Sequence, residues 1–188
     1  MSFSAIVVAA GDGLRAGPGE PKAWRLLGLR PLVRWSVQGL LSAGAHAVVV
    51  VVARDRLAAA DEALNGLAGW AAVAGGKTRA DSVRAGLAAL ACHGDQPVLI
   101  HDAARPFVTR AHVERLLTAL EAADGAVPAL PVPDTLKRGE GLIDETVSRD
   151  GLWRAQTPQA FRFGQLQAAY RNWPTGEEPT DAASVMER

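Results

Sequence analysis

Short apolar runs rich in β-branched residues alternate with helical patterns through about residue 132, and this alternation constrains the fold most strongly. Residues 5–8 and 47–52 are uninterrupted apolar runs, typical of strands that are covered on both faces. Further strands are expected at 70–74 and 97–101. Such alternation predicts an α/β fold, in which a mostly parallel sheet lies between two layers of helices.

Helices are expected wherever apolar residues recur at a spacing of three or four. Capping residues support several of these boundaries, since Thr78 opens a capping-box-like sequence and Gly44 stands where a helix would stop. The predicted helices cover residues 31–41, 57–67, 78–91, 109–123 and 163–171, with a last one beginning at Thr180. Residues 125–132 predict one strand, which prolines confine to the neighbourhood of an edge or a bulge.

A glycine-rich loop, residues 9–22, follows the first predicted strand. Gly11 and Gly13 let the backbone approach an anion, and their N–H groups lie at the carboxyl edge of the sheet. Arg15 and Lys22 add two cations, which suit a polyphosphate better than a single carboxylate. We interpret the loop as a triphosphate-binding loop, although an ordinary strand-to-helix turn would also account for the glycines alone.

Two other glycine-loop motifs fit this segment less well. A Walker loop requires Gly-Lys-Ser/Thr after the second glycine, whereas Leu14 follows Gly13. The dinucleotide fingerprint must open directly into a helix, which Gly17-Pro18-Gly19 would break. That fingerprint also needs an acidic residue about 20 positions further on, and residues 33–36 carry none.

Two more polar clusters follow predicted strands and are therefore expected at the same edge of the sheet. Gly75-Gly76 precedes a helix start, whose first turn includes Ser82; the simplest interpretation of this segment is a capped helix. Asp102 and Arg105 follow the strand at 97–101, where open α/β sheets bind ligands. Asp102 could hold Mg²⁺ or a substrate hydroxyl, and Arg105 a phosphate.

The composition limits the partners that the chain can take. The 188 residues carry 20 basic and 20 acidic side chains, so no net positive field favours nucleic acid, and none is expected as a partner. Cys92 is the single cysteine, which fits a reducing compartment. Neither a signal peptide nor a membrane-spanning run is recognised, and we expect a cytoplasmic protein with no membrane partner.

Residues 134–154 interrupt the alternation and predict an extended β-hairpin arm. The arm has too little apolar surface for a core of its own. Leu136, Val147 and Trp153 would remain exposed unless another surface covered them. A solvated flap is the alternative, but the exposed apolar residues favour dimerisation through the arm.

Several motifs, taken together, resemble the 2-C-methyl-D-erythritol 4-phosphate cytidylyltransferase family over nearly the whole chain. They are Ala9-Ala10-Gly11-x-Gly13-x-Arg15 with Pro21-Lys22, Gly75-Gly76-x-x-Arg79-x-x-Ser82-Val83, His101-Asp102-Ala103-Ala104-Arg105-Pro106, Pro133-Asp134-Thr135-Leu136-Lys137, Arg149-x-Gly151-Leu152-Trp153-x-x-Gln156-Thr157-Pro158-Gln159 and Thr180-Asp181-Ala182. The first motif marks only the wider nucleotidyltransferase superfamily. The blocks at 101–106 and 157–159 are more specific.

The resemblance implies a three-layer Rossmann-like nucleotidyltransferase fold and a reaction of isoprenoid precursor synthesis. CMP would pass from CTP to 2-C-methyl-D-erythritol 4-phosphate, giving 4-diphosphocytidyl-2-C-methyl-D-erythritol and pyrophosphate. Arg15 and Lys22 would be catalytic, and Mg²⁺ would be held mainly by the CTP phosphates, with Asp102 as a candidate ligand.

The resemblance also implies which residues bind the two substrates. The nucleotide would be bound by Ala9, Ala10, Gly11, Gly13, Gly75, Gly76 and Ser82. Methylerythritol phosphate would be bound by Asp102, Arg105 and Thr157, with Thr180 at the rim and with Thr135 and Arg149 reaching in from the arm of a second subunit. A homodimer would therefore be the functional unit.

Residues 1–188 are expected to form a single nucleotidyltransferase domain. The family continues into another strand, which bears a second active-site lysine, and a final helix. Both are absent here, so the chain was cut or belongs to a longer polypeptide, such as a fusion with a cyclodiphosphate synthase. Alternatives that stay open are transfer to another polyol phosphate such as ribitol 5-phosphate, a non-catalytic nucleotide-binding module and, with least support, an NAD-dependent oxidoreductase.

Overall fold

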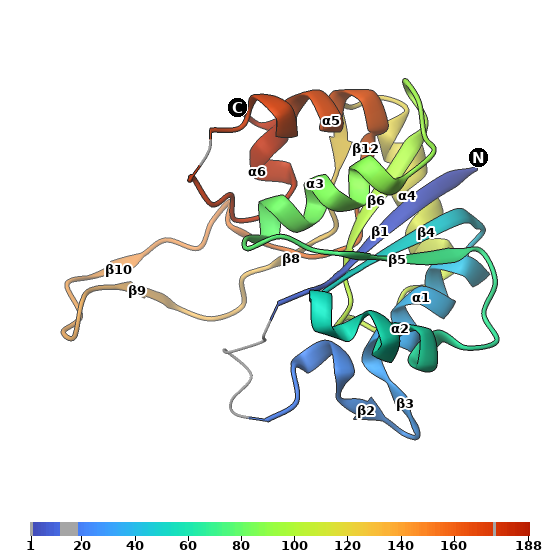
Figure 1. Cartoon of the computed structure of the whole chain (residues 1–188). Helices are drawn as coiled ribbons and strands as arrows, with labels where there is room; N and C mark the ends of the chain where they lie inside the picture. Colours follow the sequence, from blue (N-terminus) through green and yellow to red (C-terminus); the bar gives the residue numbers. More distant parts are fainter. Residues whose placement is uncertain (1, 12–18, 175) are drawn as a thin grey trace.

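The central feature of the computed structural model is a six-stranded sheet, in which the strands run in the order β5-β4-β1-β6-β12-β7 (Figure 1). The structure describes residues 2–11, 19–174 and 176–188, so the predictions at Gly13 and Arg15 lie outside the described residues. Strands β5, β4, β1 and β6 are parallel, and β12 is antiparallel to both of its neighbours. The strands are β1 (Phe3–Ala9), β4 (Ala45–Val52), β5 (Trp70–Ala74), β6 (Pro97–Asp102), β7 (Gly125–Ala126) and β12 (Gln159–Arg162).

The sheet is apolar on both faces, and each face has its own core. In β1, Ala5 and Val7 belong to one buried cluster and Ile6 belongs to the other, as the two-residue period of a strand requires. Helices α1 (Leu32–Ser42), α2 (Leu57–Leu64) and α4 (Arg110–Leu120) contribute to the first cluster; α3 (Arg79–Ala89), α5 (Phe163–Asn172) and α6 (Ala183–Met186) contribute to the second. The predicted three layers and mostly parallel sheet are therefore confirmed.

Capping interactions set several helix boundaries. The side chain of Thr78 accepts a hydrogen bond from the Asp81 N–H, so the predicted start of α3 is confirmed. Thr109 caps α4 in the same way, accepting from the His112 N–H. Gly44 has a φ of 103°, a conformation that favours glycine, and α1 ends just before it.

Several boundaries differ from the sequence predictions: α3 ends at Ala89 rather than at residue 91, α4 ends at Leu120 rather than at residue 123, and the last helix, α6, begins at Ala183 rather than at Thr180. Helix α2 ends at Leu64 rather than at residue 67, because Asn65, with a ψ of 134°, has left the helical region and Gly66 has a φ of 81°. Pro31 lies in a short hairpin and precedes α1. The hairpin pairs β2 (Leu26–Leu27) with β3 (Arg30–Pro31), and two 3₁₀ turns, η2 (Lys22–Trp24) and η3 (Arg54–Arg56), were also not predicted.

The single strand predicted at 125–132 is wrong, because this segment forms two strands in different sheets. Strand β7 pairs with β12 at the edge of the main sheet. Strand β8 (Ala129–Pro131) pairs instead with β11 (Trp153–Ala155), at the base of the predicted arm. Pro128 lies between the two strands, and proline cannot donate to a ladder.

The predicted arm is present as a hairpin of β9 (Leu136–Arg138) and β10 (Glu145–Val147), which extends away from the rest of the chain (Figure 1). Its turn exposes Leu142 and Ile143, at 81% and 69% of their surfaces. Within the described ranges, no helix combines the length and apolarity needed to cross a membrane.

Candidate active site

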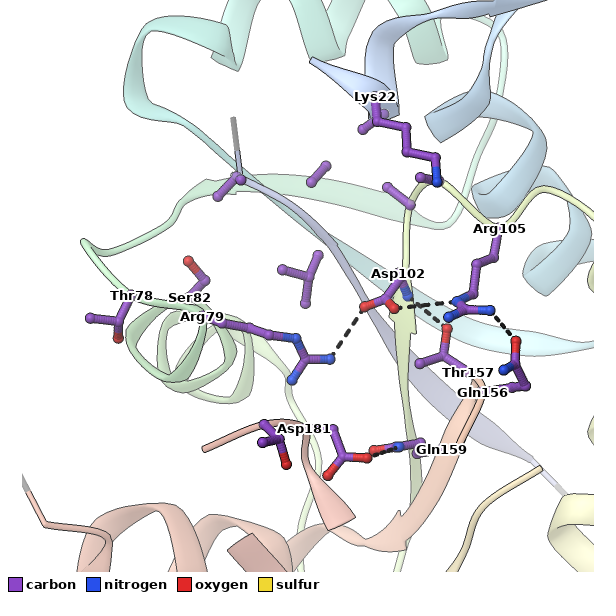
Figure 2. A pocket seen from close by; sticks show the side chains of 18 of the residues that line it. Lys22, Thr78, Arg79, Ser82, Asp102, Arg105, Gln156, Thr157, Gln159 and Asp181 are labelled. Carbon is purple, nitrogen blue, oxygen red and sulfur yellow. Dashed lines mark hydrogen bonds and ion pairs between the residues drawn. The ribbon is translucent and has the colours of Figure 1, made fainter. Parts of the chain in front are cut away.

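A cavity of about 980 Å³ lies at the carboxyl edge of the parallel strands, where the chain changes direction across the sheet. From β1 the chain moves to β4 and β5 on one side, and it then returns to β6 on the other side of β1. Ligands of open α/β sheets bind at such a point. The cavity is lined by residues from the ends of β1 and β6, from the start of α3, and from residues 155–159 and 180–181 (Figure 2).

Positive charge is concentrated in the cavity, although the chain as a whole has no net charge. Its described lining includes four basic side chains, Lys22, Lys77, Arg79 and Arg105, and two acidic ones. Lys22 begins η2, and its ammonium group points toward the end of β6 (Figure 2). The local excess of cations suits an anionic ligand that carries several charges.

Asp102 is the centre of the polar network in this cavity. Its Oδ1 accepts from the Arg79 Nη2 at 3.2 Å, and its Oδ2 accepts from the Arg105 Nε at 3.4 Å. Arg105 also donates to the Gln156 side chain (Figure 2). The buried Nη1 of Arg79 has no hydrogen-bond partner among the described residues. Arg79 therefore retains one donor that a ligand oxygen could satisfy.

Behind Asp102, a buried histidine fixes the hydroxyl group of Thr157. The Nε2 of His101 is 3.0 Å from the Arg105 carbonyl oxygen, and its Nδ1 is 3.1 Å from the Thr157 Oγ1. The same Oγ1 accepts from the Asp102 N–H at 3.1 Å. Burial lowers the pKa of His101 from its usual 6.5 to about 4, despite the opposing charge of Asp102. His101 is therefore neutral at pH 7.

Glycines form the wall between β1 and α3. A Cβ atom at Gly75 would lie 2.7 Å from the Ser82 Oγ and 2.8 Å from the Ala10 Cβ. At Gly76 it would lie 2.2 Å from the Asp81 Cβ. All three distances are shorter than real contacts, so only glycine leaves backbone atoms accessible on this side of the cavity.

Most of the residues that the sequence predicts for the site are brought together. Ten of them line the cavity, namely Ala9, Ala10, Gly11, Lys22, Gly76, Ser82, Asp102, Arg105, Thr157 and Thr180. Gly75 lies directly behind Ser82 and Ala10, whereas Thr135 and Arg149 are on the arm and are not among the described residues of the lining. Their roles, like those of the ten, stay predictions.

Several other polar residues of the cavity were not predicted as site residues, namely Lys77, Arg79, Gln156, Gln159 and Asp181. Arg79 and Gln156 join the network around Asp102, and the Gln159 Nε2 donates to the Asp181 Oδ2 at 2.6 Å. Most of these residues stand in the motifs that resemble the family, and those motifs could have identified them as site residues. Arg79 is the first residue of α3, and a helix start at this edge of the sheet faces the ligand.

The chain has the fold class of the nucleotidyltransferases: a three-layer, Rossmann-like structure whose glycine-walled, cationic cavity lies at the edge of the sheet. The sequence model of the 2-C-methyl-D-erythritol 4-phosphate cytidylyltransferase family, IspD, matches residues 3–188. The chain therefore belongs to this family.

Curated relatives and solved structures agree with this assignment. The chain is 57% identical to the "Bifunctional enzyme IspD/IspF" of Caulobacter vibrioides, over 100% of the chain and 49% of that protein. It is 46% identical to the enzyme of the same name from Rhizorhabdus wittichii, over 98% of the chain and 48% of that protein. The chain thus spans about half the length of these relatives.

Among solved structures, the 2-C-methyl-D-erythritol 4-phosphate cytidylyltransferase of Thermus thermophilus has a TM-score of 0.80 at 35% identity. The alignment covers 100% of this chain and 84% of that structure. The bifunctional IspDF of Campylobacter jejuni has a TM-score of 0.82 at 27% identity, with 100% of this chain and 47% of that one covered. Both similarities extend over the whole of this chain.

Proposed function

We propose that this chain transfers CMP from CTP to 2-C-methyl-D-erythritol 4-phosphate and releases pyrophosphate. The cationic cavity at the β1–β6 edge carries the proposal, since it brings Lys22, Asp102 and Arg105 together. Membership of the cytidylyltransferase family supports the choice of substrates.

The nucleotide would occupy the side of the cavity that the ends of β1 and β5 form. The backbone near Ala10 and Gly76 is accessible there and can hydrogen-bond to the edge of a flat base, while Ser82 offers a hydroxyl. The triphosphate would then extend toward Lys22. Arg15, outside the described residues, is the second cation that the sequence predicts for it.

The reaction is an in-line displacement at the α-phosphorus. A phosphate oxygen of the acceptor forms the new P–O bond as the bond to pyrophosphate breaks, and negative charge increases on the oxygens between them. Lys22 and Arg15 would stabilise that charge, while the cavity holds the two reactants in register. This displacement requires no protein nucleophile.

Magnesium fits the site only as a partner of the nucleotide. Over the part of the chain that the structure describes, no group of three or more His, Cys, Asp or Glu residues could hold a metal ion. Asp102 is the ligand that the sequence predicts, and two arginines already share its carboxylate. Mg²⁺ often takes one carboxylate together with substrate phosphates. When bound, the ion would neutralise phosphate charge.

The acceptor would bind on the β6 side of the cavity. Arg105 can take a phosphate oxygen with donors that its neighbours leave free, while Asp102 and Thr157 offer acceptors for hydroxyl groups. Thr180 lines the same cavity from the segment before α6.

A second copy of the chain would complete the acceptor site through the arm. Thr135 and Arg149 lie on the arm, outside the described lining of their own cavity, and Arg149 donates to the Pro133 carbonyl oxygen. The exposed Leu142 and Ile143 need an apolar partner to become buried. A homodimer, in which each arm reaches the other subunit, meets both requirements.

Because its bifunctional relatives are about twice as long, we also propose that the chain is the cytidylyltransferase half of a two-domain enzyme. On this proposal residues 1–188 are its nucleotidyltransferase domain, as the sequence predicts. A cytoplasmic location for the protein stays a prediction, and the single cysteine is one of its grounds.

Pyrophosphate release from CTP, Mg²⁺ and methylerythritol phosphate tests the proposed reaction. Lys22→Ala should lower kcat by about 10²–10³, because a charge that stabilises the transition state is removed. Arg171→Ala is the matched control, since this exposed arginine of α5 is not among the described residues of the cavity lining and donates to Gln167 on its own helix. Unchanged turnover in Lys22→Ala would exclude its proposed role, and a higher rate with ribitol 5-phosphate would change the assigned acceptor.

Mixing two inactive variants tests the shared site. Lys22→Ala and Arg149→Ala subunits should be inactive alone, and exchange between them should restore activity, because each mixed dimer has one site without either substitution. Arg149→Ala mixed with itself is the control. If the mixture stays inactive although exchange is verified by mass, Arg149 does not act in the site of a second subunit.

A further inference from the structure

The hydroxyl group of Thr157 has its hydrogen-bonding capacity almost fully used by the protein. Thr157 lines the cavity but is only 8% exposed. A threonine hydroxyl has one donor hydrogen and two acceptor lone pairs. What remains for a ligand therefore depends on the two groups that already bond to Oγ1, which are the His101 Nδ1 and the Asp102 N–H.

The tautomer of His101 follows from its other contact. Nε2 faces the Arg105 carbonyl oxygen at 3.0 Å, and a carbonyl oxygen can only accept. Nε2 must therefore carry the proton. Because the ring is fully buried and its Nδ1 faces a hydroxyl group rather than an anion, a second proton there would leave an unpaired buried charge, so Nδ1 carries only a lone pair.

The proton of the Thr157 hydroxyl is consequently committed to Nδ1. The Asp102 N–H occupies one of the two lone pairs on Oγ1. One lone pair is left for the cavity, and no donor is left. An ionised phosphate oxygen is itself an acceptor, so Thr157 cannot bind it with a hydrogen bond.

We infer that Thr157 accepts a hydrogen bond from a hydroxyl group on the carbon chain of the acceptor substrate, and that His101 is the positioning residue that fixes this polarity. The inference rests on the proposed function for the identity of the substrate. It separates two tasks within the site: the cations take the phosphate, while Thr157 recognises a hydroxylated carbon chain.

The carboxylate of Asp102 strengthens this assignment. It is the next acceptor group along the same wall, since the Asp102 N–H bonds directly to Thr157. Carboxylate oxygens, like the free lone pair of Thr157, bind donors. Two neighbouring acceptors suit a polyol better than a phosphate.

Nitrogen NMR of the histidine ring tests the polarity without any substrate. With ¹⁵N-labelled histidine in the full chain, His101 should show a protonated Nε2 and an unprotonated Nδ1, and the His101→Asn variant should assign its signals. A protonated Nδ1 would overturn the inference, because Thr157 would then be free to donate. This result does not depend on whether the chain transfers CMP.

Kinetics with deoxygenated acceptors test the contact itself. Thr157→Val should raise the KM for the acceptor about tenfold, as expected when one hydrogen bond is lost, with the KM for CTP unchanged and with recovery in Thr157→Ser. Of a series of acceptor analogues that each lack one hydroxyl, one should have the same KM with the wild-type protein and with Thr157→Val. An equal penalty for every analogue would overturn the inference.

His101→Leu tests the positioning role. It should raise the acceptor KM by no more than Thr157→Val does, because Oγ1 keeps its lone pairs but loses its fixed orientation; the effect should be larger on KM than on kcat, and the double variant should show no loss beyond that of Thr157→Val. Additive losses would mean that the two residues act separately, and they would overturn the role of His101. If the wild-type protein used no polyol phosphate at all, the proposed function would fail, and the NMR experiment would still decide the polarity.

Discussion

His101 should make the folded protein sensitive to mild acid. The imidazole is fully buried on β6, and burial lowers its pKa from 6.5 to about 4. The charges that face it oppose one another: Asp102 raises the pKa, whereas Arg105 and His112 lower it. In the unfolded chain the same ring would titrate near its usual value.

The sign of the effect follows from proton counting. Between pH 6.5 and about 4 the unfolded state binds a proton at His101 and the folded state does not, so the free energy of unfolding falls as the pH falls. At about 1.4 kcal/mol per pH unit, the full interval corresponds to about 3 kcal/mol. Above pH 6.5 this residue contributes no pH dependence.

Urea unfolding of the wild-type chain and of His101→Asn, from pH 7.5 to 4 in Mg²⁺-free buffer, measures this contribution. Carboxylates titrate in both proteins, so the difference between the two free energies isolates the histidine. The wild-type advantage should shrink by about 3 kcal/mol over the interval. A difference that stays constant with pH would refute the reasoning, because it would mean that the folded protein accepts the proton as easily as the unfolded chain.

Three further variants follow from the packing and the charges. Gly86→Ala should lower the free energy of unfolding by about 1–3 kcal/mol in urea, because its Cβ would lie 2.6 Å from the Ile6 Cγ2; an unchanged value would mean that α3 can shift outward. Gly75→Ala should weaken CTP binding in calorimetry, because the new methyl group would displace Ser82; equal affinity would exclude this wall from the nucleotide site. Asp102→Asn should raise the acceptor KM by about tenfold or more, because its two arginine partners lose their anion; an unchanged KM would remove the residue from the acceptor site.

Local sequence was sufficient to predict strands and helix starts that depend on apolar runs and capping residues. The strand at Trp70–Ala74 and the start of α3 after Thr78 were predicted correctly, since apolar runs and caps act over a few neighbouring residues. The end of α2 was placed three residues too late. Leu67 continues the apolar pattern, but the backbone at Gly66 has already left the helix.

Pairing between distant segments could not be predicted in the same way. The segment at 125–132 has one apolar pattern but two partners, β12 and β11, and both come later in the chain. Whether each half of the segment pairs with β12 or with β11 depends on how the other strands of the sheet pack. The site could also be predicted only in part. The position of Asp102 after a strand predicted that it would lie at the edge of the sheet, but not that Arg79 would donate to its carboxylate.

The cavity draws its lining from Val8 at one extreme and from Asp181 at the other. During synthesis on the ribosome, the lining of the site is therefore complete only after the segment at 180–181 has been made, long after the first strand. A nascent chain released early would have a substantial sheet and the nucleotide side of the cavity but would lack the lining at 155–159 and 180–181, so the acceptor side would be the last part of the site to form.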